Sequence, residues 1–482
     1  MKGPSGFYSS LGLLILLNAV IKPLWVFGID RQVQNVVGLE TYGVYFSLLN
    51  LSIVLSFLSD WGFTAFFNRQ LAAHEKNFSE HTGNFLLLKL LFSFFYFIIV
   101  FAAAWFSGVK RWDILLYTVL IQIFTSLFLF FRAIITSHQW FRTEAWLSVT
   151  DKTLMILVCG IFLYFPSLFG SMTIDRFLFF QTSSLAIAMT VSLFFLLNKK
   201  ISFSFVKNWW PDKIILLQIL PFGIIVLMMS VHSRLDAFLL ERISSNGAYE
   251  AGIYAAAYRL LDAANIACFI IASFMLPYIA RRWSKNEEIN SSLLNCRHLL
   301  LLFAIGVSSV TVFLAPWIQE ALYHHDDAAA VQVLQWCLPS LMGYAITHIY
   351  GTALTATGRV VEFCYIVLIS VIINVALNLL LIPSMGAKGC CFAALASQSF
   401  CAIATMLYVK RKLVLSLDTR SLLIYIFTAA LLSGFFFVGR DWPVAKWLLI
   451  LTAAMLTITI MLATKLTGIT TWIGSLKSRT IN

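Results

Sequence analysis

The stretch NFLLLKLLFSFFYFIIVFAAAWFS, residues 84–107, decides the fold class, because it is long enough to cross a membrane and carries one charged residue, Lys89. A helix needs about 20 mostly apolar residues to cross roughly 30 Å of hydrocarbon. Similar runs recur along the whole chain of 482 residues, of which 60% are hydrophobic and 12% charged. Such a composition is too apolar for a water-soluble surface. The sequence therefore predicts an all-α integral membrane protein.

The apolar runs predict about 14 membrane-spanning helices. The spans are expected near residues 9–30, 42–67, 84–107, 112–136, 146–166, 176–197, 214–240, 250–279, 298–318, 328–353, 360–383, 388–409, 420–438 and 443–466. The segments between them are too short to form a folded domain. The function is therefore expected inside the bilayer.

The basic residues gather in alternate loops, and this pattern sets an orientation. One side carries Lys199, Lys200, Lys207, Lys213, Arg281, Arg282, Lys285, Lys410, Arg411 and Lys412. The opposite side carries the acidic Asp326 and Asp327. Because cytoplasmic loops are enriched in Lys and Arg, both termini are expected in the cytoplasm. The net charge of +12 is then a signal of topology and does not indicate a nucleic-acid partner.

An internal repeat organises the chain. Residues 38–45 read GLETYGVY and residues 247–254 read GAYEAGIY, so that Gly, Gly and Tyr fall at the same relative positions. The shift from Gly38 to Gly247 also carries the first and second spans onto the seventh and eighth, as a duplication requires. Six spans separate the copies, and an even number makes the two halves face the same way. The sequence predicts two pseudo-symmetric six-helix lobes, residues 1–205 and 206–412, followed by two further helices and a cytoplasmic tail, residues 413–482.

Charged residues inside the spans mark the expected site, because a charge in hydrocarbon is costly unless it faces a cavity or a partner. They lie on the first, second, seventh and eighth spans, which the repeat pairs. The candidates for a cationic cavity that binds substrate are Lys22, Arg31, His232, Arg234 and Arg259. The candidates for a gate or an ion-coupling site are Asp30, Asp60, Asp236 and Asp262. A cavity lined by positive charge suits an anionic substrate such as a phosphate or pyrophosphate.

Other polar residues of the spans are expected to play structural roles. Lys89, Arg132, Asp151 and Lys152 are placed near cytoplasmic helix ends, from which long side chains reach the interface. Asn374 and Asn378 are one turn apart and are expected to form hydrogen bonds between helices. Pro23 is expected to kink the first span.

Motifs for catalysis and cofactors are missing. The chain has no G-x-G-x-x-G, G-x-x-x-x-G-K-[ST] or H-E-x-x-H, so neither ATP hydrolysis nor zinc hydrolysis is indicated. Residues 324–327 read HHDD, but four adjacent residues in a short loop do not converge easily on a metal, so no metal site is expected. The protein is expected not to be an enzyme and to need no cofactor. Coupling to H⁺, Na⁺ or the membrane potential is left open, and a membrane glycosyltransferase or polymerase is the enzyme alternative.

With the repeated entry into the second and eighth spans, and with LSDWGFTAFFNR at residues 58–69, the chain resembles the polysaccharide flippases of the multidrug, oligosaccharidyl-lipid and polysaccharide exporter superfamily. In that family the second helix ends in an aspartate, a glycine and a basic residue, here Asp60, Gly62 and Arg69. The eighth carries an A-x-R-like step, here Ala257 to Arg259, and the seventh an aspartate, here Asp236. The resemblance covers roughly residues 8–410.

The resemblance implies a transporter that flips an undecaprenyl-pyrophosphate-linked oligosaccharide, an O-antigen or other polysaccharide repeat unit, by alternating access of two lobes. It implies as partners the lipid-linked glycan, membrane lipids and other polysaccharide assembly proteins. Two relatives compete within the superfamily. A lipid II flippase also has fourteen spans and a cationic cavity, whereas a multidrug exporter would prefer acidic and aromatic cavity residues.

Overall fold

The structure is a computed structural model that describes residues 4–64, 67–68, 71, 81–201, 203–205, 213–324, 327–413, 419–442 and 444–464. Its first half contains α1 (Pro4–Pro23), the π-helix η1 (Leu24–Asp30), α2 (Arg31–Val37), α3 (Leu39–Leu55), the 3-10 helix η2 (Ser56–Ser59), α6 (Thr82–Phe106), α7 (Trp112–Ser137), α8 (Phe141–Tyr164), α9 (Pro166–Phe169) and α10 (Ile174–Asn198). Its second half contains α11 (Lys213–Ile243), α12 (Gly247–Ser284), α13 (Asn290–Tyr323), α14 (Ala328–Cys337), the 3-10 helix η3 (Leu338–Ser340), α15 (Leu341–Ala356), α16 (Val360–Leu413), α17 (Thr419–Gly439) and α18 (Lys446–Ala463).

The number of spans agrees with the prediction once α16 is divided. The described residues contain 13 helices that are long and apolar enough to cross a membrane, and no strand. At about 1.5 Å per residue, the 54 residues of α16 are far too long for one crossing. Its backbone breaks at Gly386, where φ is 55° and ψ is −135°, a conformation that glycine adopts readily. Division at Gly386 gives two spans from α16 and confirms the all-α fold with about 14 helices.

The second span departs from the prediction. A continuous helix was expected over residues 42–67, but α3 ends at Leu55, and η2 and a turn follow it. The turn has positive φ at Trp61 and at Gly62, 48° and 81° respectively. Because an α-helix cannot pass through left-handed residues, the span is broken at Asp60, where the sequence places a candidate charge.

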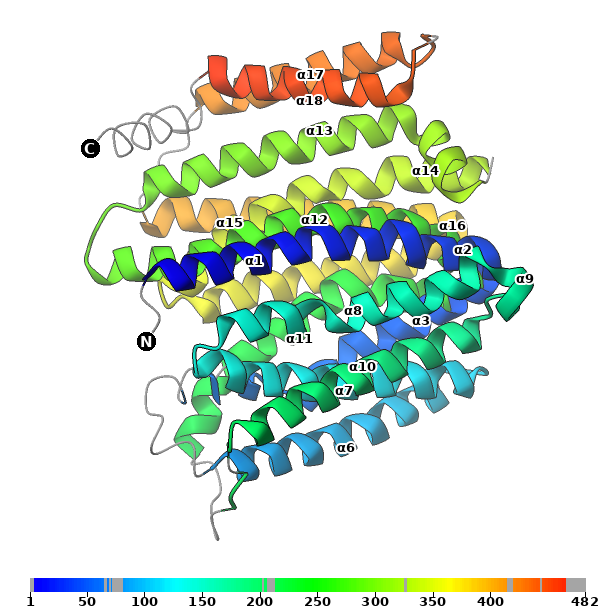
Figure 1. Ribbon diagram of the computed structural model, residues 1–482. Coiled ribbons are helices and arrows are strands. Elements are labelled where there is room, and N and C mark those ends of the chain that lie inside the picture. The colour runs from blue at the N-terminus through cyan, green and yellow to red at the C-terminus, as the bar shows by residue number, and fades with distance from the viewer. Residues whose placement is uncertain are drawn as a thin grey trace. The chain divides into compact units, whose positions relative to one another are not determined.

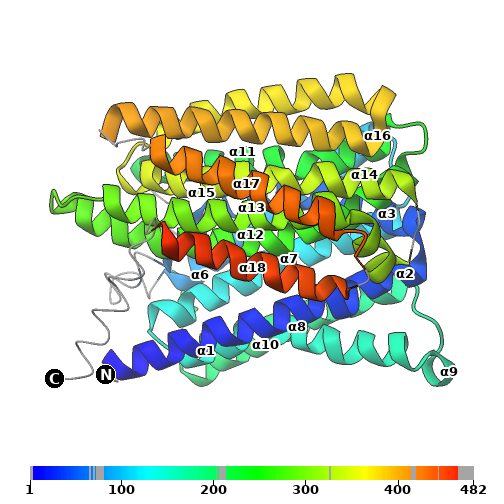
Figure 2. The same cartoon turned by 90° about the horizontal axis from the view of Figure 1, so that it is seen from above.

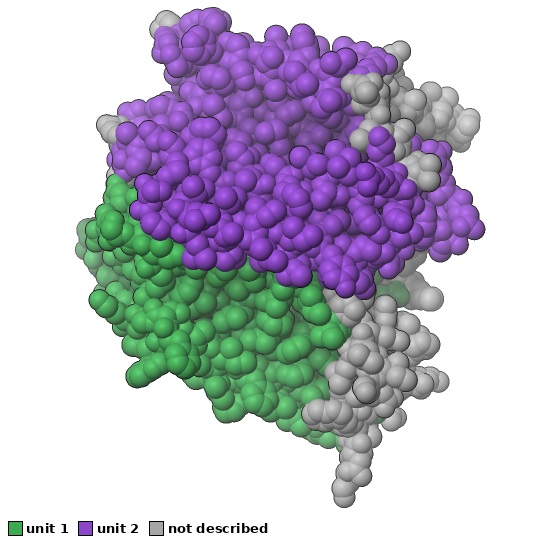
Figure 3. Space-filling view, turned by 180° about the vertical axis from the view of Figure 1, so that it is seen from behind, with its two compact units in different colours: residues 1–252 green, residues 253–482 purple. Residues whose placement is uncertain are grey.

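The chain forms two compact units, which Figure 3 distinguishes by colour. Unit 1 is residues 1–252, and unit 2 is residues 253–482. α12 begins in unit 1 and continues into unit 2, and α11 belongs to unit 1. The predicted lobe limits at residues 205 and 412 stay a prediction.

Unit 1 is built from helices that pack in pairs. α1 lies along α8, α3 along α11 and α7 along α10 (Figure 1). Aromatic side chains fill part of its core: the ring centroids of Trp25 and Phe177 are 6.0 Å apart, and those of Tyr45 and Phe177 are 5.7 Å apart. Such rings bury much apolar surface and fix the orientation of neighbouring helices. They hold the end of α1, and with it Lys22, against α10.

Unit 2 follows the same packing rule. α15 packs on α16, and α13 contacts α14, α15, α17 and α18. α13, α17 and α18 can be followed in Figure 2, which shows the ribbon from above. Tyr323, at the end of α13, donates a hydrogen bond from its hydroxyl to the carbonyl oxygen of Ala256, 3.0 Å away. Asn374 donates to Ser397 Oγ, 3.3 Å away, across the break in α16, so it bonds between helices as expected.

The two copies of the repeat meet in unit 1 through their equivalent glycines. A Cβ on Gly43 would lie 1.9 Å from the carbonyl oxygen of Ala248, and a Cβ on Gly252 would lie 2.2 Å from that of Leu39. The repeat carries Leu39 onto Ala248 and Gly43 onto Gly252, so the two contacts are equivalent under the duplication. Only glycine allows two helix backbones to approach so closely. The matching contacts support the duplication inferred from the sequence.

Candidate functional site

Lys22 lies at the end of α1, near the middle of the candidate membrane span Gly12–Val37. Pro23 has no N–H and its ring crowds the preceding turn, so the α-helical pattern does not pass through it unchanged. The backbone continues as a π-helix over Leu24–Asp30. This helix type is rare in proteins, and where it occurs it often lies at a functional site. The structure shows a change of helix type after Pro23, and the kink expected there stays a prediction.

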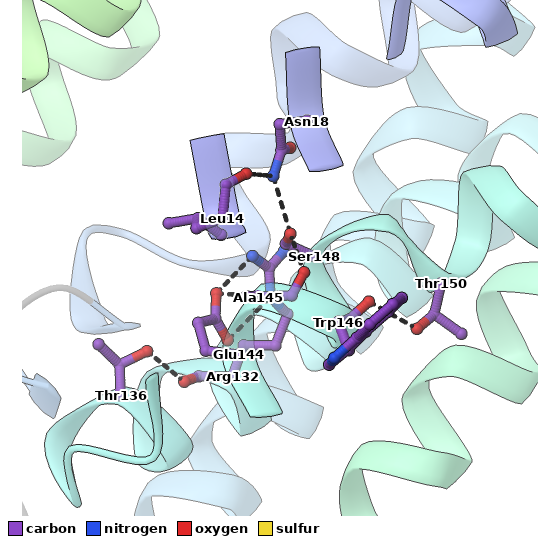
Figure 4. A network of polar contacts seen from close by, with 9 residues as sticks. All are labelled: Leu14, Asn18, Arg132, Thr136, Glu144, Ala145, Trp146, Ser148 and Thr150. Atoms are coloured by element: carbon purple, nitrogen blue, oxygen red, sulfur yellow. Dashed lines mark hydrogen bonds and ion pairs between the residues drawn. The ribbon is translucent and has the colours of Figure 1, made fainter. Parts of the chain in front are cut away.

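Asn18 fixes the register of α1 against α8. Its side-chain amide donates to the carbonyl oxygen of Leu14 and to Ser148 Oγ, each 2.9 Å away (Figure 4). Lys22 is one turn beyond Asn18, and Lys152 is one turn beyond Ser148, so the two lysines lie on the facing sides of the helix pair. The Lys22 ammonium interacts electrostatically with Arg132, Asp151 and Lys152 but makes no hydrogen bond or ion pair with any residue in the described part of the chain.

The two carboxylates near Lys22, those of Glu144 and Asp151, are each paired with another cation. Glu144 on α8 accepts hydrogen bonds from Nε and Nη2 of Arg132 on α7, with Nε 3.0 Å from Oε1 (Figure 4). Asp151 Oδ2 lies 3.2 Å from Lys152 Nζ. We call Lys22, Arg132, Glu144, Asp151 and Lys152 the α1/α7/α8 cluster. It holds three cations and two carboxylates, which leaves the charge of Lys22 without a carboxylate of its own.

The position of Asp151 and Lys152 corrects the sequence prediction. They were expected near a helix end, because the span was expected to begin at residue 146. α8 begins at Phe141, so Lys152 is at the middle of a 24-residue helix and lies about 16 Å from its start. A lysine side chain at that depth does not reach the interface by extending along its helix. Its ammonium instead lies 5.0 Å from the ring centroid of Trp25.

Lys89 was also expected to reach the interface, and the structure shows otherwise. It is 2% exposed, and its ammonium contacts Asp60 Oδ1 directly and Thr64 Oγ1 at 2.8 Å. Thr64 also donates to Asp60. Asp60 is 31% exposed and stands at the break in the second span. The candidate gate or coupling residue therefore has a buried cation as its partner, which the sequence did not reveal.

Asp30 and Arg31 lie at the far end of the π-helix. Asp30 is buried and accepts a hydrogen bond from the hydroxyl of Tyr42, 2.9 Å away. Arg31 is half-buried and donates to Oε1 of its neighbour Gln32 at 3.2 Å. These residues are separated from Lys22 by about two turns, so they belong to a different level of the span.

The three candidates of the seventh span do not share a face. α11 continues as a helix through them, and His232 and Asp236 are four residues apart on one face, where both are buried. Arg234 lies on another face and is half-buried. Because α11 does not unwind here, the spacing of two residues keeps Arg234 off the face that His232 and Asp236 share.

Arg259 and Asp262 lie on α12 in unit 2, three residues apart on one face and both half-buried. That they line one cavity with the candidates of unit 1 stays a prediction. Of the residues that carry the family resemblance, Arg69 lies outside the described part of the chain.

Two residues of the HHDD stretch, His325 and Asp326, also lie outside the described part of the chain. The described residues contain no group of three or more His, Cys, Asp or Glu placed to hold a metal.

The sequence did contain a signal for the residues it missed. Glu144, Ser148 and Lys152 recur every four residues along α8, as Asn18 and Lys22 do along α1. Polar residues at this spacing lie on one face of a helix. Two such stripes in apolar spans indicate helices that face each other.

A comparison with protein families identifies the chain. The family model described as polysaccharide biosynthesis protein matches residues 11–283, which is more than half of the chain. The protein belongs to that family. A second family model, MatE, matches residues 221–380. A search of curated proteins finds no match.

Solved structures show that the polysaccharide biosynthesis family member has the fold of known transporters. A multidrug resistance MATE family transporter in an inward-facing conformation matches with a TM-score of 0.65 and 12% identity, over 84% of this chain and 98% of the other. The lipid II flippase MurJ matches with a TM-score of 0.64 and 15% identity, over 94% and 97%. A MOP superfamily transporter from Pyrococcus furiosus matches with a TM-score of 0.57 and 14% identity, over 84% and 92%.

These matches confirm three predictions. The chain belongs to the multidrug, oligosaccharidyl-lipid and polysaccharide exporter superfamily, and it is a multi-pass membrane transporter. Its families are transporters rather than enzymes, which removes the glycosyltransferase alternative.

Proposed function

We propose that this transporter flips an undecaprenyl-pyrophosphate-linked oligosaccharide, an O-antigen or other polysaccharide repeat unit, across the bacterial plasma membrane by alternating access. Membership of the polysaccharide biosynthesis family supports a cargo of this class. The observation that carries the proposal is Lys22, a half-buried cation at mid-depth that has no carboxylate of its own. An uncompensated charge at this depth is costly, and an anionic cargo group would neutralise it.

The sign of the charge argues against a drug exporter. Cationic drugs need acidic or aromatic partners, and the α1/α7/α8 cluster has more cations than carboxylates. Lipid II, which also carries a pyrophosphate, is the second candidate, and the match to a lipid II flippase over 94% of this chain favours it. Both cargoes require the same cationic site and differ in the sugar.

The orientation completes the proposal. The basic loops of residues 199–213, 281–285 and 410–412 support a cytoplasmic location for both termini. The cargo then enters from the cytoplasmic leaflet, where lipid-linked sugars are assembled, and leaves in the outer leaflet. Asp30, Asp60, Asp236 and Asp262 are the candidates for the gate or for H⁺ or Na⁺ coupling, and we propose no cofactor.

Export of surface polysaccharide by a deletion strain that expresses variants tests the proposal. We expect Lys22→Ala and Arg259→Ala to abolish export while the amount of protein in the membrane is unchanged. Lys285→Ala, which alters an exposed lysine outside the cluster, is the matched control and should export normally. Deletion should make undecaprenyl-linked repeat units accumulate on the cytoplasmic side. Normal export by both variants would refute the cationic site, and accumulated lipid II would favour the second candidate.

A further inference from the structure

We propose that Lys22 and Lys152 form the subsite that holds the cargo phosphate at mid-depth, inside unit 1, and that Arg132 stands on the approach to it. This inference rests on the proposed function and assigns part of it to two residues, Arg132 and Lys152, for which the sequence predicts a structural role. The three cations come from three helices, α1, α7 and α8, and Arg132 and Lys152 both interact electrostatically with Lys22, which lies one turn beyond the Asn18–Ser148 hydrogen bond. A phosphate can accept several charge-assisted hydrogen bonds at once, which suits such convergence.

The ion pairs of the α1/α7/α8 cluster allow a cation to exchange its carboxylate for a phosphate. Arg132 is held by three hydrogen bonds to Glu144, whereas Lys152 has one ion-pair contact, with the adjacent Asp151. The Lys152 side chain is 26% exposed, so an anion can reach it. When a phosphate arrives, Lys152 can leave Asp151 and join Lys22 on the new anion, while Arg132 adds positive potential from its fixed position.

Depth decides which phosphate the subsite takes. Lys152 lies about 16 Å from the start of α8, roughly half of a 30 Å hydrocarbon layer. The phosphates of ordinary phospholipids stay at the interface, because charge in the hydrocarbon is costly. A phosphate at mid-depth therefore belongs to a lipid whose head group is crossing the membrane, which is the cargo.

The polar residues that recur every four positions along α8 give this phosphate a route into the membrane. Glu144 lies in the first turn of α8, Ser148 one turn deeper and Lys152 one turn deeper again. Arg132, Asn18 and Lys22 contribute from the facing helices. A head group that entered at the start of α8 would meet the positive charge of Arg132 first and the Lys22–Lys152 pair at the centre.

Binding to the purified full chain in nanodiscs, followed by native mass spectrometry, tests the subsite. The probes are undecaprenyl pyrophosphate, undecaprenol and dioleoyl phosphatidic acid. We expect undecaprenyl pyrophosphate to bind more tightly than undecaprenol. Lys152→Gln should weaken that binding by about 10- to 100-fold, the loss of one charge-assisted hydrogen bond. Lys152→Arg should restore most of it.

Asp151→Asn separates electrostatics from folding. Removal of the carboxylate that competes for Lys152 should tighten pyrophosphate binding, opposite in sign to Lys152→Gln, whereas a structural role would make both variants bind worse. Lys199→Gln is the matched control, since Lys199 lies over the rings of Trp140 and Phe195 at the end of α10. This variant should bind undecaprenyl pyrophosphate as tightly as the wild-type protein.

Three results would overturn the subsite. One is unchanged binding by Lys152→Gln, and another is a loss of binding by both Lys152→Gln and Asp151→Asn. Equally tight binding of phosphatidic acid with the same dependence on Lys152 would show a site for ordinary membrane lipid. The proposed function fails separately, if the deletion strain accumulates no lipid-linked oligosaccharide.

Discussion

The close contact of Gly43 and Gly252 leads to a sharp prediction about stability. A Cβ on Gly43 would lie 1.9 Å from the oxygen of Ala248, 2.7 Å from the nitrogen of Gly252 and 3.0 Å from the carbonyl carbon of Ala248. A close carbon–oxygen contact is about 3.3 to 3.6 Å, so α3 and the start of α12 must part by roughly 1.4 Å. All three atoms are backbone and cannot rotate away, unlike the end of a flexible side chain.

Overpacking of this kind usually costs about 1–3 kcal/mol. We expect Gly43→Ala to lower the free energy of unfolding by about 3 kcal/mol, the upper end, because rigid backbone must move. Gly252→Ala should have a similar effect. The double variant should cost less than the sum of the two, since the first methyl already separates the helices at the second contact.

Reversible unfolding of the purified protein in mixed micelles measures these differences. Gly160→Ala in α8 is the matched control, because a Cβ there would meet nothing within 4 Å. It should leave stability unchanged or raise it by up to about 1 kcal/mol, the helix preference of alanine over glycine. If Gly43→Ala proved as stable as Gly160→Ala, or if the two damaging changes added fully, the crossing would not be as close as described.

Three other predictions concern the broken spans and the topology. Asp60→Asn should destabilise the protein more than Lys89→Met. The first change leaves the ammonium of Lys89, which is 2% exposed, without its carboxylate, whereas the second leaves the carboxylate of Asp60, which is 31% exposed, without its cation. The melting temperatures of the two variants in detergent measure the difference. Gly386→Ala should cost about 1–3 kcal/mol in the same assay, since φ of 55° with ψ of −135° is strained for alanine, and an unchanged melting temperature would contradict the break in α16. A cysteine at Lys285, introduced into a chain cleared of its native cysteines, should be modified by a membrane-impermeant thiol reagent only after the cells are opened, and labelling of intact cells would reverse the orientation.

Much of the fold could be predicted because lipid leaves the backbone few choices. Without water to satisfy its peptide groups, an apolar run of sufficient length becomes a helix. The division of α16 at Gly386 agreed with the predicted gap between residues 383 and 388. The end of the second helix at Leu55 could not be predicted, since Ser56 to Phe63 holds only one charge, Asp60, and one glycine, Gly62, which are too few to separate a turn from a helix by composition.

The candidate site was only partly predictable, because which charges meet depends on packing between helices. Lys22 lies near the middle of the candidate span Gly12–Val37, close to where the sequence placed it, since its position within an apolar run is a local property. Lys152 was misplaced by a shift of five residues in the start of α8, which turned a residue at the membrane centre into one near the surface. The partnership of Lys89 with Asp60 joins two spans, and no spacing within one helix indicates it.

Translocation in reconstituted liposomes tests the central claim most directly. A fluorescent undecaprenyl-pyrophosphate oligosaccharide is placed in one leaflet, and its arrival in the other is followed with a membrane-impermeant quencher. We expect the wild-type protein to move it and Lys22→Ala to leave it in place, with Lys285→Ala as active as wild type. Transport that is equally fast with Lys22→Ala, or a wild-type protein that moves a cationic dye and not the lipid-linked glycan, would contradict the account.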